Sequence, residues 1–206
     1  MGLDLQEALF LYIVIILSAI IHEYAHGWMA YQQGDPTAKY AGRLTLNPIA
    51  HIDMWGTVLM PLILLYFFHF FFGYAKPVPI NPNNFRDQRK GLILVSLAGP
   101  GSNLLVALIL GMIVRFSPDL MIIPFLGFIV YINIWLALFN LIPVPPLDGS
   151  KLLFGLTSYR SGGAINFLSG TGSWFGIIIA LFIAFSIMPF IAEFIFKLIT
   201  GVGIGI

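Results

Sequence analysis

The sequence predicts an all-α membrane protein: a polytopic helical bundle with a small β-hairpin or edge-strand element and a re-entrant or interfacial segment. Three observations indicate this fold class. Hydrophobic residues make up 59% of the 206 residues and charged residues only 9%, whereas a soluble domain carries roughly 25% charged residues. Four apolar stretches are long enough to cross a bilayer, and prolines and glycines break the connections between them. We expect one membrane domain over residues 1–206, with its core at about 8–157.

The four predicted spans follow from length, because crossing the hydrocarbon core takes about 20 apolar residues. They run over about residues 8–31, 92–114, 121–141 and 174–198. A fifth stretch, Trp55 to Phe72, is shorter, contains Pro61 and ends in an aromatic cluster with His69. Since aromatic residues gather at membrane interfaces, we expect this segment to be re-entrant or interfacial and His69 to lie at the interface.

Two polar connections predict the β element. Tyr40 to Leu46 alternates in polarity like a short strand. Lys76 to Ile80 contains Pro77 and Pro79, which forbid a helix and a central strand but permit an edge strand.

Charge and cysteine content exclude several classes of function. The net charge is +1, which gives no basis for nucleic-acid binding. Cysteine is absent, so the chain has neither disulfides nor thiolate metal sites. Any transition metal must therefore be bound by histidine and carboxylate.

The first apolar stretch contains the motif His22-Glu23-Tyr24-Ala25-His26. Residues four apart lie on one face of a helix, so His22 and His26 can bind one metal ion. Glu23 is close enough to reach a metal-bound water, which makes the motif two zinc ligands plus a general base. The alternative is a chance match, but three ionisable residues inside an apolar span cost on the order of a few kcal/mol each, and such groups are functional candidates.

Catalytic zinc usually takes three protein ligands and one water. Asp148 is the preferred third ligand, because it lies near the end of the proline-broken stretch Asn140–Gly149 that follows an apolar span, and irregular backbone at membrane depth lines a cavity or is buried in protein. The alternative role for Asp148 is to cap a helix over about 149–157. The charges of Zn²⁺, Asp148 and Glu23 add up to zero, and a low-dielectric site favours such a neutral group. The other candidates are His51, His69, Asp35, Asp53, Asp87, Asp119 and Glu193.

Several motifs in combination resemble the site-2 protease family of intramembrane zinc metalloproteases, in its compact subgroup without PDZ or CBS domains. The resemblance covers about residues 8–157. It is carried by the His22–His26 motif, by Ser96-Leu97-Ala98-Gly99-Pro100-Gly101-Ser102-Asn103, by Asn140-Leu141-Ile142-Pro143-Val144-Pro145-Pro146-Leu147-Asp148-Gly149, and by the segments Asn47–Asp53 and Gly73–Pro79.

This resemblance implies one Zn²⁺ per chain, bound by His22, His26 and Asp148, with a zinc-bound water as nucleophile and Glu23 as general base. It also implies hydrolysis of a peptide bond within or near a transmembrane segment of a membrane protein substrate, as in regulated intramembrane proteolysis. The implied partners are that substrate and the lipid bilayer; an oligomer is possible but does not follow from the sequence.

The predicted membrane topology follows from the requirement that His22, His26 and Asp148 lie on the same side of the membrane, where they can bind one metal ion. His22 and His26 lie near the end of the first span and Asp148 just past the third, so a full crossing at Trp55–Phe72 would place Asp148 on the wrong side. A re-entrant segment puts eight of the 10 basic residues on one side, against six for a full crossing. The positive-inside rule favours the former, with the N-terminus outside and the site near the cytosol of a prokaryotic cytoplasmic membrane. The eight are Lys39, Arg43, Lys76, Arg86, Arg89, Lys90, Lys151 and Arg160.

Weaker candidates complete the site. Lys76, Pro77, Val78, Pro79 and Ile80 could hold an unwound substrate by β-augmentation, or could be a plain proline-stiffened loop. Asn140 and His51 are candidate catalytic donors to the developing oxyanion. Asn140 could equally satisfy backbone groups at a helix end, and His51 could be an ordinary interfacial histidine. Gly99 and Asn103 indicate a close helix contact.

A different class of function stays open, namely a non-proteolytic zinc-binding membrane protein such as a metal carrier or a pseudoprotease scaffold. Carriers tend to show internal repeats and several ionisable residues along a path, whereas this chain has one cluster and no repeat. A pseudoenzyme would usually lack the base, and Glu23 is present.

Overall fold

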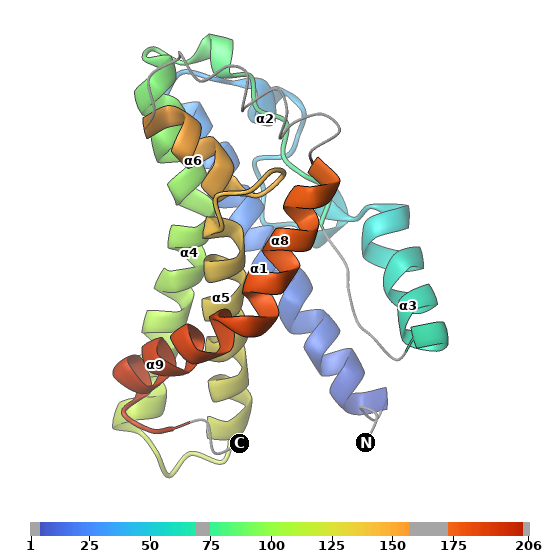
Figure 1. The fold of residues 1–206 in the computed structure, drawn as a ribbon, viewed down its shortest axis with the longest axis vertical. Coiled ribbons are helices and arrows are strands. Elements are labelled where there is room, and N and C mark those ends of the chain that lie inside the picture. Colours follow the sequence, from blue (N-terminus) through green and yellow to red (C-terminus); the bar gives the residue numbers. More distant parts are fainter. Residues whose placement is uncertain (1–4, 69–74, 157–172, 204–206) are drawn as a thin grey trace. The chain divides into compact units, whose positions relative to one another are not determined.

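The computed structural model describes residues 5–68, 75–156 and 173–203 (Figure 1). His69 and Arg160 lie outside the described residues. Contacts group the chain into two compact units, Met1–Arg86 and Asp87–Ile206, and each is described by itself.

Long apolar helices dominate the described chain and confirm an integral, multi-pass membrane protein. Three helices are long and apolar enough to cross a membrane, and a bent helix pair counts as a fourth if it forms one span. The three are α1 (Leu5–Gln32), α4 (Gln88–Phe116) and α5 (Ile123–Leu141). α1 and α4 contain the corresponding predicted stretches, and α5 begins at Ile123 within the third stretch, so the first three predicted spans are confirmed as helices.

The first unit consists of α1 and a series of short helices that follow it. Gly34, at a φ of +107°, turns the chain after α1. The Tyr12 hydroxyl of α1 donates to the Thr57 carbonyl over 2.7 Å, which ties the later part of the unit to this helix. The short elements are α2 (Thr37–Tyr40), the 3₁₀ helix η1 (Pro48–His51), the π-helix η2 (Met54–Leu59), α3 (Met60–Phe68) and the 3₁₀ helix η3 (Pro82–Asn84).

The predicted re-entrant or interfacial segment is helical in its described part. Asp53 begins it by accepting hydrogen bonds from the N–H groups of Trp55 and Gly56. The 6 residues of η2 and the 9 residues of α3 rise at most about 22 Å, which is short of the ~30 Å hydrocarbon core. The described part alone is too short to cross the membrane, and the re-entrant or interfacial character of Trp55–Phe72 stays a prediction.

The predicted β-hairpin or edge-strand element is wrong, because no strand is assigned between residues 5 and 68, 75 and 156, or 173 and 203. Tyr40 ends α2, and the residues up to Leu46 form a turn and bends, with Gly42 at a φ of +66°. Lys76 to Ile80 has no regular secondary structure.

The backbone groups of the Lys76–Ile80 segment have partners other than a neighbouring strand. The Arg43 guanidinium donates to the carbonyl oxygens of Lys76 and Pro77. The Lys76 N–H donates to the His51 carbonyl over 2.9 Å. Since Pro77 and Pro79 also lack an N–H, this segment presents no continuous ladder of donors and acceptors.

The second unit packs small residues of α4 against α5. Asn103 of α4 is fully buried, and its side-chain amide nitrogen donates to the side-chain Oδ1 of Asn133 in α5 over 2.9 Å. Gly99 is buried on the same face of α4, so this face makes the close helix contact expected from the sequence. An apolar core joins α4 and α5 to the last helix, and it contains Ala107, Val130, Ile134, Ala192 and Phe196.

The last predicted span, about residues 174–198, is not one straight helix. It consists of α8 (Ser173–Ser186) and α9 (Met188–Thr200), and the chain bends by 53° between Ala180–Ser186 and Met188–Thr200. Pro189 lies in the first turn of α9. Proline lacks an N–H and clashes with the carbonyl one turn earlier, so a helix cannot continue straight through it.

Candidate metal centre

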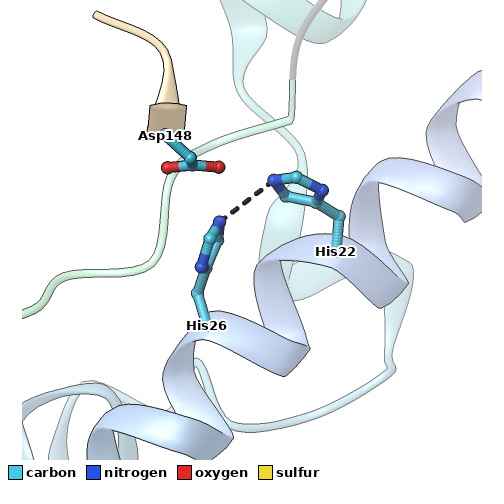
Figure 2. Close-up of side chains that lie close together, drawn as sticks. All are labelled: His22, His26 and Asp148. Carbon is cyan, nitrogen blue, oxygen red and sulfur yellow. Dashed lines mark hydrogen bonds between the residues drawn. The ribbon is translucent and has the colours of Figure 1, made fainter. Parts of the chain in front are cut away.

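Two imidazoles on one face of α1 approach each other closely. His22 and His26 are 6% and 5% exposed, and their Nε2 atoms lie 3.0 Å apart (Figure 2). Two nitrogen ligands at the usual zinc distance of 2.0–2.1 Å in a tetrahedral site lie about 3.3 Å apart. The spacing of the two rings therefore fits a shared zinc ion, as the H-E-x-x-H pattern predicts.

Asp148 is the first residue of α6 (Asp148–Leu156) in the second unit, and it is buried. Gly149 makes this position possible, because a Cβ there would lie 2.2 Å from the Leu141 carbonyl oxygen and 2.5 Å from that of Ile142. Any other residue at 149 would force α6 away from the end of α5. The sequence Asp-Gly thus places the carboxylate directly beyond the proline-broken stretch.

His22 and His26 of the first unit and Asp148 of the second unit are all buried, and each has a side chain that can bind a metal ion. Two imidazoles and a carboxylate are a donor set typical of zinc. Asp148 also pairs with Lys151, whose Nζ lies 2.8 Å from Oδ1. The sequence reasoning missed Lys151, although its i+3 spacing on a helix was a signal for this pair.

Glu23 is hydrogen-bonded to the segment Lys76–Ile80, which lies far from the motif along the sequence. Its Oε2 accepts a hydrogen bond from the Val78 N–H over 2.8 Å. These residues are 55 positions apart, so no local pattern indicated the contact. Glu23, which the motif designates as general base, is half-buried. Its carboxylate has a defined hydrogen-bond partner in the Val78 N–H.

The other sequence candidates for the site have structural partners. His51 is 1% exposed, and its Nε2 lies 2.8 Å from the Thr45 carbonyl. The Asn140 amide nitrogen donates to the Leu136 carbonyl one turn earlier over 2.9 Å. Asp53 and Asp87 accept backbone hydrogen bonds at the start of η2 and α4. These contacts give Asn140, Asp53 and Asp87 structural roles without a metal, whereas the buried Nδ1 of His51 has no hydrogen-bond partner within the described part of the chain.

Asp35 is fully buried just after α1. There it accepts hydrogen bonds from residues that follow later in the first unit. Its carboxylate accepts hydrogen bonds from the N–H and hydroxyl of Thr37, from the Asn81 N–H over 2.7 Å and from the Asn84 amide over 2.8 Å. Burial alone would raise the pKa of this carboxyl, but the hydrogen bonds outweigh it and lower the pKa below 3.8. Asp35 thus fixes the Asn81–Asn84 turn to the end of α1.

We expect Asp35→Asn to destabilise the protein by about 1–3 kcal/mol, because the new NH₂ faces donors in place of an acceptor. The lowered pKa means that Asp35 contributes stability above pH 3.8 that is lost as the pH falls through its folded value. Thermal unfolding in detergent should therefore lose more stability on acidification in the native chain than in the variant. Identical pH profiles would contradict this role, and exposed Asp119→Asn is the control.

Comparison with known proteins points to one family. The profile of peptidase family M50 matches residues 116–182. YwhC of Bacillus subtilis, a candidate zinc metalloprotease, is 41% identical over 156 residues, which cover 70% of this chain and 67% of YwhC. Rip2 of Mycolicibacterium smegmatis, also a candidate zinc metalloprotease, is 31% identical over 140 residues, covering 65% of this chain and 52% of Rip2. No solved structure matches the chain.

The match extends along most of the chain. Rip2 of Mycobacterium tuberculosis is 28% identical over 142 residues, so the chain spans about two thirds of YwhC and about half of the Rip2 proteins. The similarity to YwhC and the family profile agree with the motif in α1. The chain therefore belongs to peptidase family M50, the site-2 protease family of zinc metalloproteases.

Proposed function

We propose that this protein is an intramembrane zinc endopeptidase that hydrolyses a peptide bond within or near a transmembrane segment of another membrane protein. The observation that carries the proposal is the convergence of the His22 and His26 Nε2 atoms inside the long apolar helix α1. Ionisable groups inside a span are expensive and mark functional sites. Placing them in α1 puts the chemistry where a membrane-spanning substrate can reach it.

His22, His26 and Asp148 would hold one Zn²⁺, with Asp148 completing the pair on α1. Bound there, zinc polarises the scissile carbonyl and lowers the pKa of a water ligand towards about 7. The carboxylates of Asp148 and Glu23 would offset the two positive charges of the ion, which reduces the cost of burying it, while the Lys151 ammonium beside Asp148 is half-exposed to solvent. The Lys151 ammonium on Asp148 gives that ligand a fixed orientation.

Glu23 acts as the general base. It accepts the proton of the attacking water and then delivers it to the nitrogen of the leaving amine, so that no charged amide is expelled. A positioned acid–base group of this kind contributes typically 10²–10⁴-fold to the rate. His51 and Asn140 are the proposed donors to the oxyanion; Asn140 would have to exchange its bond to the Leu136 carbonyl for this task.

A transmembrane substrate must unwind before its peptide bond becomes accessible, because a helix hides its backbone in its own hydrogen bonds. Lys76 to Ile80 is the segment that we propose binds the unwound chain. The Val78 contact with Glu23 puts this segment beside the base, and Pro77 and Pro79 are exposed on it. Several of its backbone groups already have partners within the protein, so the segment would contact the substrate through its exposed side chains.

The catalytic side of the membrane is proposed to be the cytosolic side, with Trp55–Phe72 re-entrant. Reporter fusions after Gly73 and after Lys90 should both give a cytosolic signal, because the basic residues Lys76, Arg86 and Arg89 flank these points. An external signal at either position would contradict the re-entrant topology. A fusion after Arg115, expected outside, is the control for the reporter.

The direct test of the function is cleavage of a co-expressed single-span substrate by the native chain and by Glu23→Gln. Cleavage that depends on Glu23, with one zinc per chain in both proteins, supports the endopeptidase. A metal carrier or a pseudoprotease scaffold would bind zinc and leave the substrate intact in both cases.

A further inference from the structure

Within the described residues, one backbone N–H is hydrogen-bonded to Glu23, the proposed general base. The Val78 N–H donates to Glu23 Oε2 over 2.8 Å. Val78 lies between Pro77 and Pro79, and proline has no N–H. Val78 is therefore the one residue of this tripeptide whose backbone can make such a bond, and the two prolines restrict the backbone that carries it.

A glycine on α1 makes room for Val78 beside the base. Glu23 and Gly27 are four residues apart and lie on the same face of the helix. A Cβ added at Gly27 would lie 3.0 Å from Val78 Cγ1 and 3.3 Å from the Cβ of Ala38. The Val78 side chain is 6% exposed. It rests against the bare backbone of α1, and this close approach brings its N–H within hydrogen-bonding distance of Glu23.

Other contacts fix the segment independently of Glu23. On one side of Val78, the Lys76 N–H donates to the His51 carbonyl over 2.9 Å and Arg43 donates to the Lys76 carbonyl over 2.6 Å. On the other side, the Asn81 N–H donates to Asp35 over 2.7 Å. Val78 is thus a donor held in place from both ends, and its bond to Glu23 restrains the flexible carboxylate more than it restrains the segment.

We propose that Val78 and Gly27 are positioning residues for the general base. The Val78 N–H binds Oε2 and orients the carboxylate so that Oε1 takes the proton from the attacking water, and Gly27 provides the space that this contact needs. The inference rests on the proposed function, in which Glu23 is the base. A base must be held near its productive geometry by such supporting contacts, since a misplacement of about 1 Å can cost 10²-fold in rate.

Hydrogen exchange measures the contact itself without reference to activity. In the peptide from Lys76 to Ile80, Glu23→Ala should accelerate exchange of one amide hydrogen by at least about 10-fold, because the Val78 N–H loses its acceptor. Glu193→Ala, which alters a glutamate of α9 in the second unit, should leave this peptide unchanged. An exchange rate that does not respond to Glu23→Ala would overturn the proposal.

Steric compensation tests the consequence for catalysis. Gly27→Ala should lower kcat by about 10–100-fold at unchanged KM and zinc content, because the new methyl group displaces Val78. Adding Val78→Ala should restore kcat to within about 3-fold, since it removes the atom that the methyl group meets. Gly101→Ala of α4 is the matched control, because a Cβ there meets nothing within 4 Å.

The outcomes separate this inference from the proposed function. Full activity of Gly27→Ala, or a double variant that stays impaired with normal zinc content, would overturn the positioning role while leaving the protease intact. Cleavage that persists in Glu23→Gln would overturn the function itself. If Gly27→Ala does not accumulate as folded protein, the exchange rate of the Val78 amide in Glu23→Ala still tests whether the Val78 N–H binds Glu23.

Discussion

Glu23→Gln is expected to abolish cleavage of a membrane substrate while the protein keeps its zinc. Glutamine has nearly the same shape and can still accept the Val78 N–H through its carbonyl oxygen, so the fold around α1 should persist. It cannot take a proton from water, and loss of a general base costs about 10²–10⁴-fold in rate. The measurement is single-turnover cleavage of a reconstituted single-span substrate together with the zinc content of each protein.

The matched control for this variant is a glutamate far along the chain from the motif. Glu193→Gln, in α9, should leave both cleavage and zinc content unchanged. If Glu23→Gln cleaved at the native rate, Glu23 could not be the base. If it lost zinc as well as activity, the loss of activity would follow from the loss of the metal. The result would then not support Glu23 as the proton acceptor.

Loss of a metal ligand should have a different signature, in which zinc and activity disappear together. We expect Asp148→Ala and His26→Ala each to weaken zinc binding by more than about 100-fold, beyond the 10–100-fold that loss of an outer-shell partner costs. Removing Asp148 also leaves the Lys151 ammonium without its carboxylate, which adds positive charge beside the site. Equilibrium competition with a chromogenic zinc chelator measures the affinity.

A matched aspartate distinguishes a specific ligand from a general effect of charge. Asp119→Ala removes an exposed carboxylate of the second unit, so its zinc affinity should equal that of the native protein. Native zinc affinity in Asp148→Ala would contradict the proposed ligand set and would require a different third ligand from the remaining acidic or histidine residues.

Local patterns were enough to predict the long helices and the histidine pair. The apolar run around His22 and His26 specifies a helix, and their spacing of four then places both rings on one face. The same reasoning predicted a short apolar segment at Trp55 whose described part is helical, while its re-entrant character stays a prediction. These features depend on residues within one or two helical turns of each other.

The errors arose where distant residues decide the structure. Lys76 to Ile80 reads as an edge strand, but Arg43 and Glu23 bind its backbone groups from elsewhere in the sequence. Hydropathy predicted one span at the end of the chain but gave no sign of the 53° bend that precedes Pro189. The steric requirement for Gly149 likewise depends on the carbonyls that end α5. A single sequence contains no direct signal for such contacts.

X-ray absorption at the zinc edge of the purified protein tests the central claim most directly. The account predicts one zinc per chain with four nitrogen or oxygen neighbours at about 2.0–2.1 Å, two of them imidazoles, as expected for two histidines, one carboxylate and one water. His26→Ala should lose one imidazole contribution or lose the metal altogether. A native spectrum without imidazole scattering, or a protein that binds no zinc, would contradict the assignment of this centre.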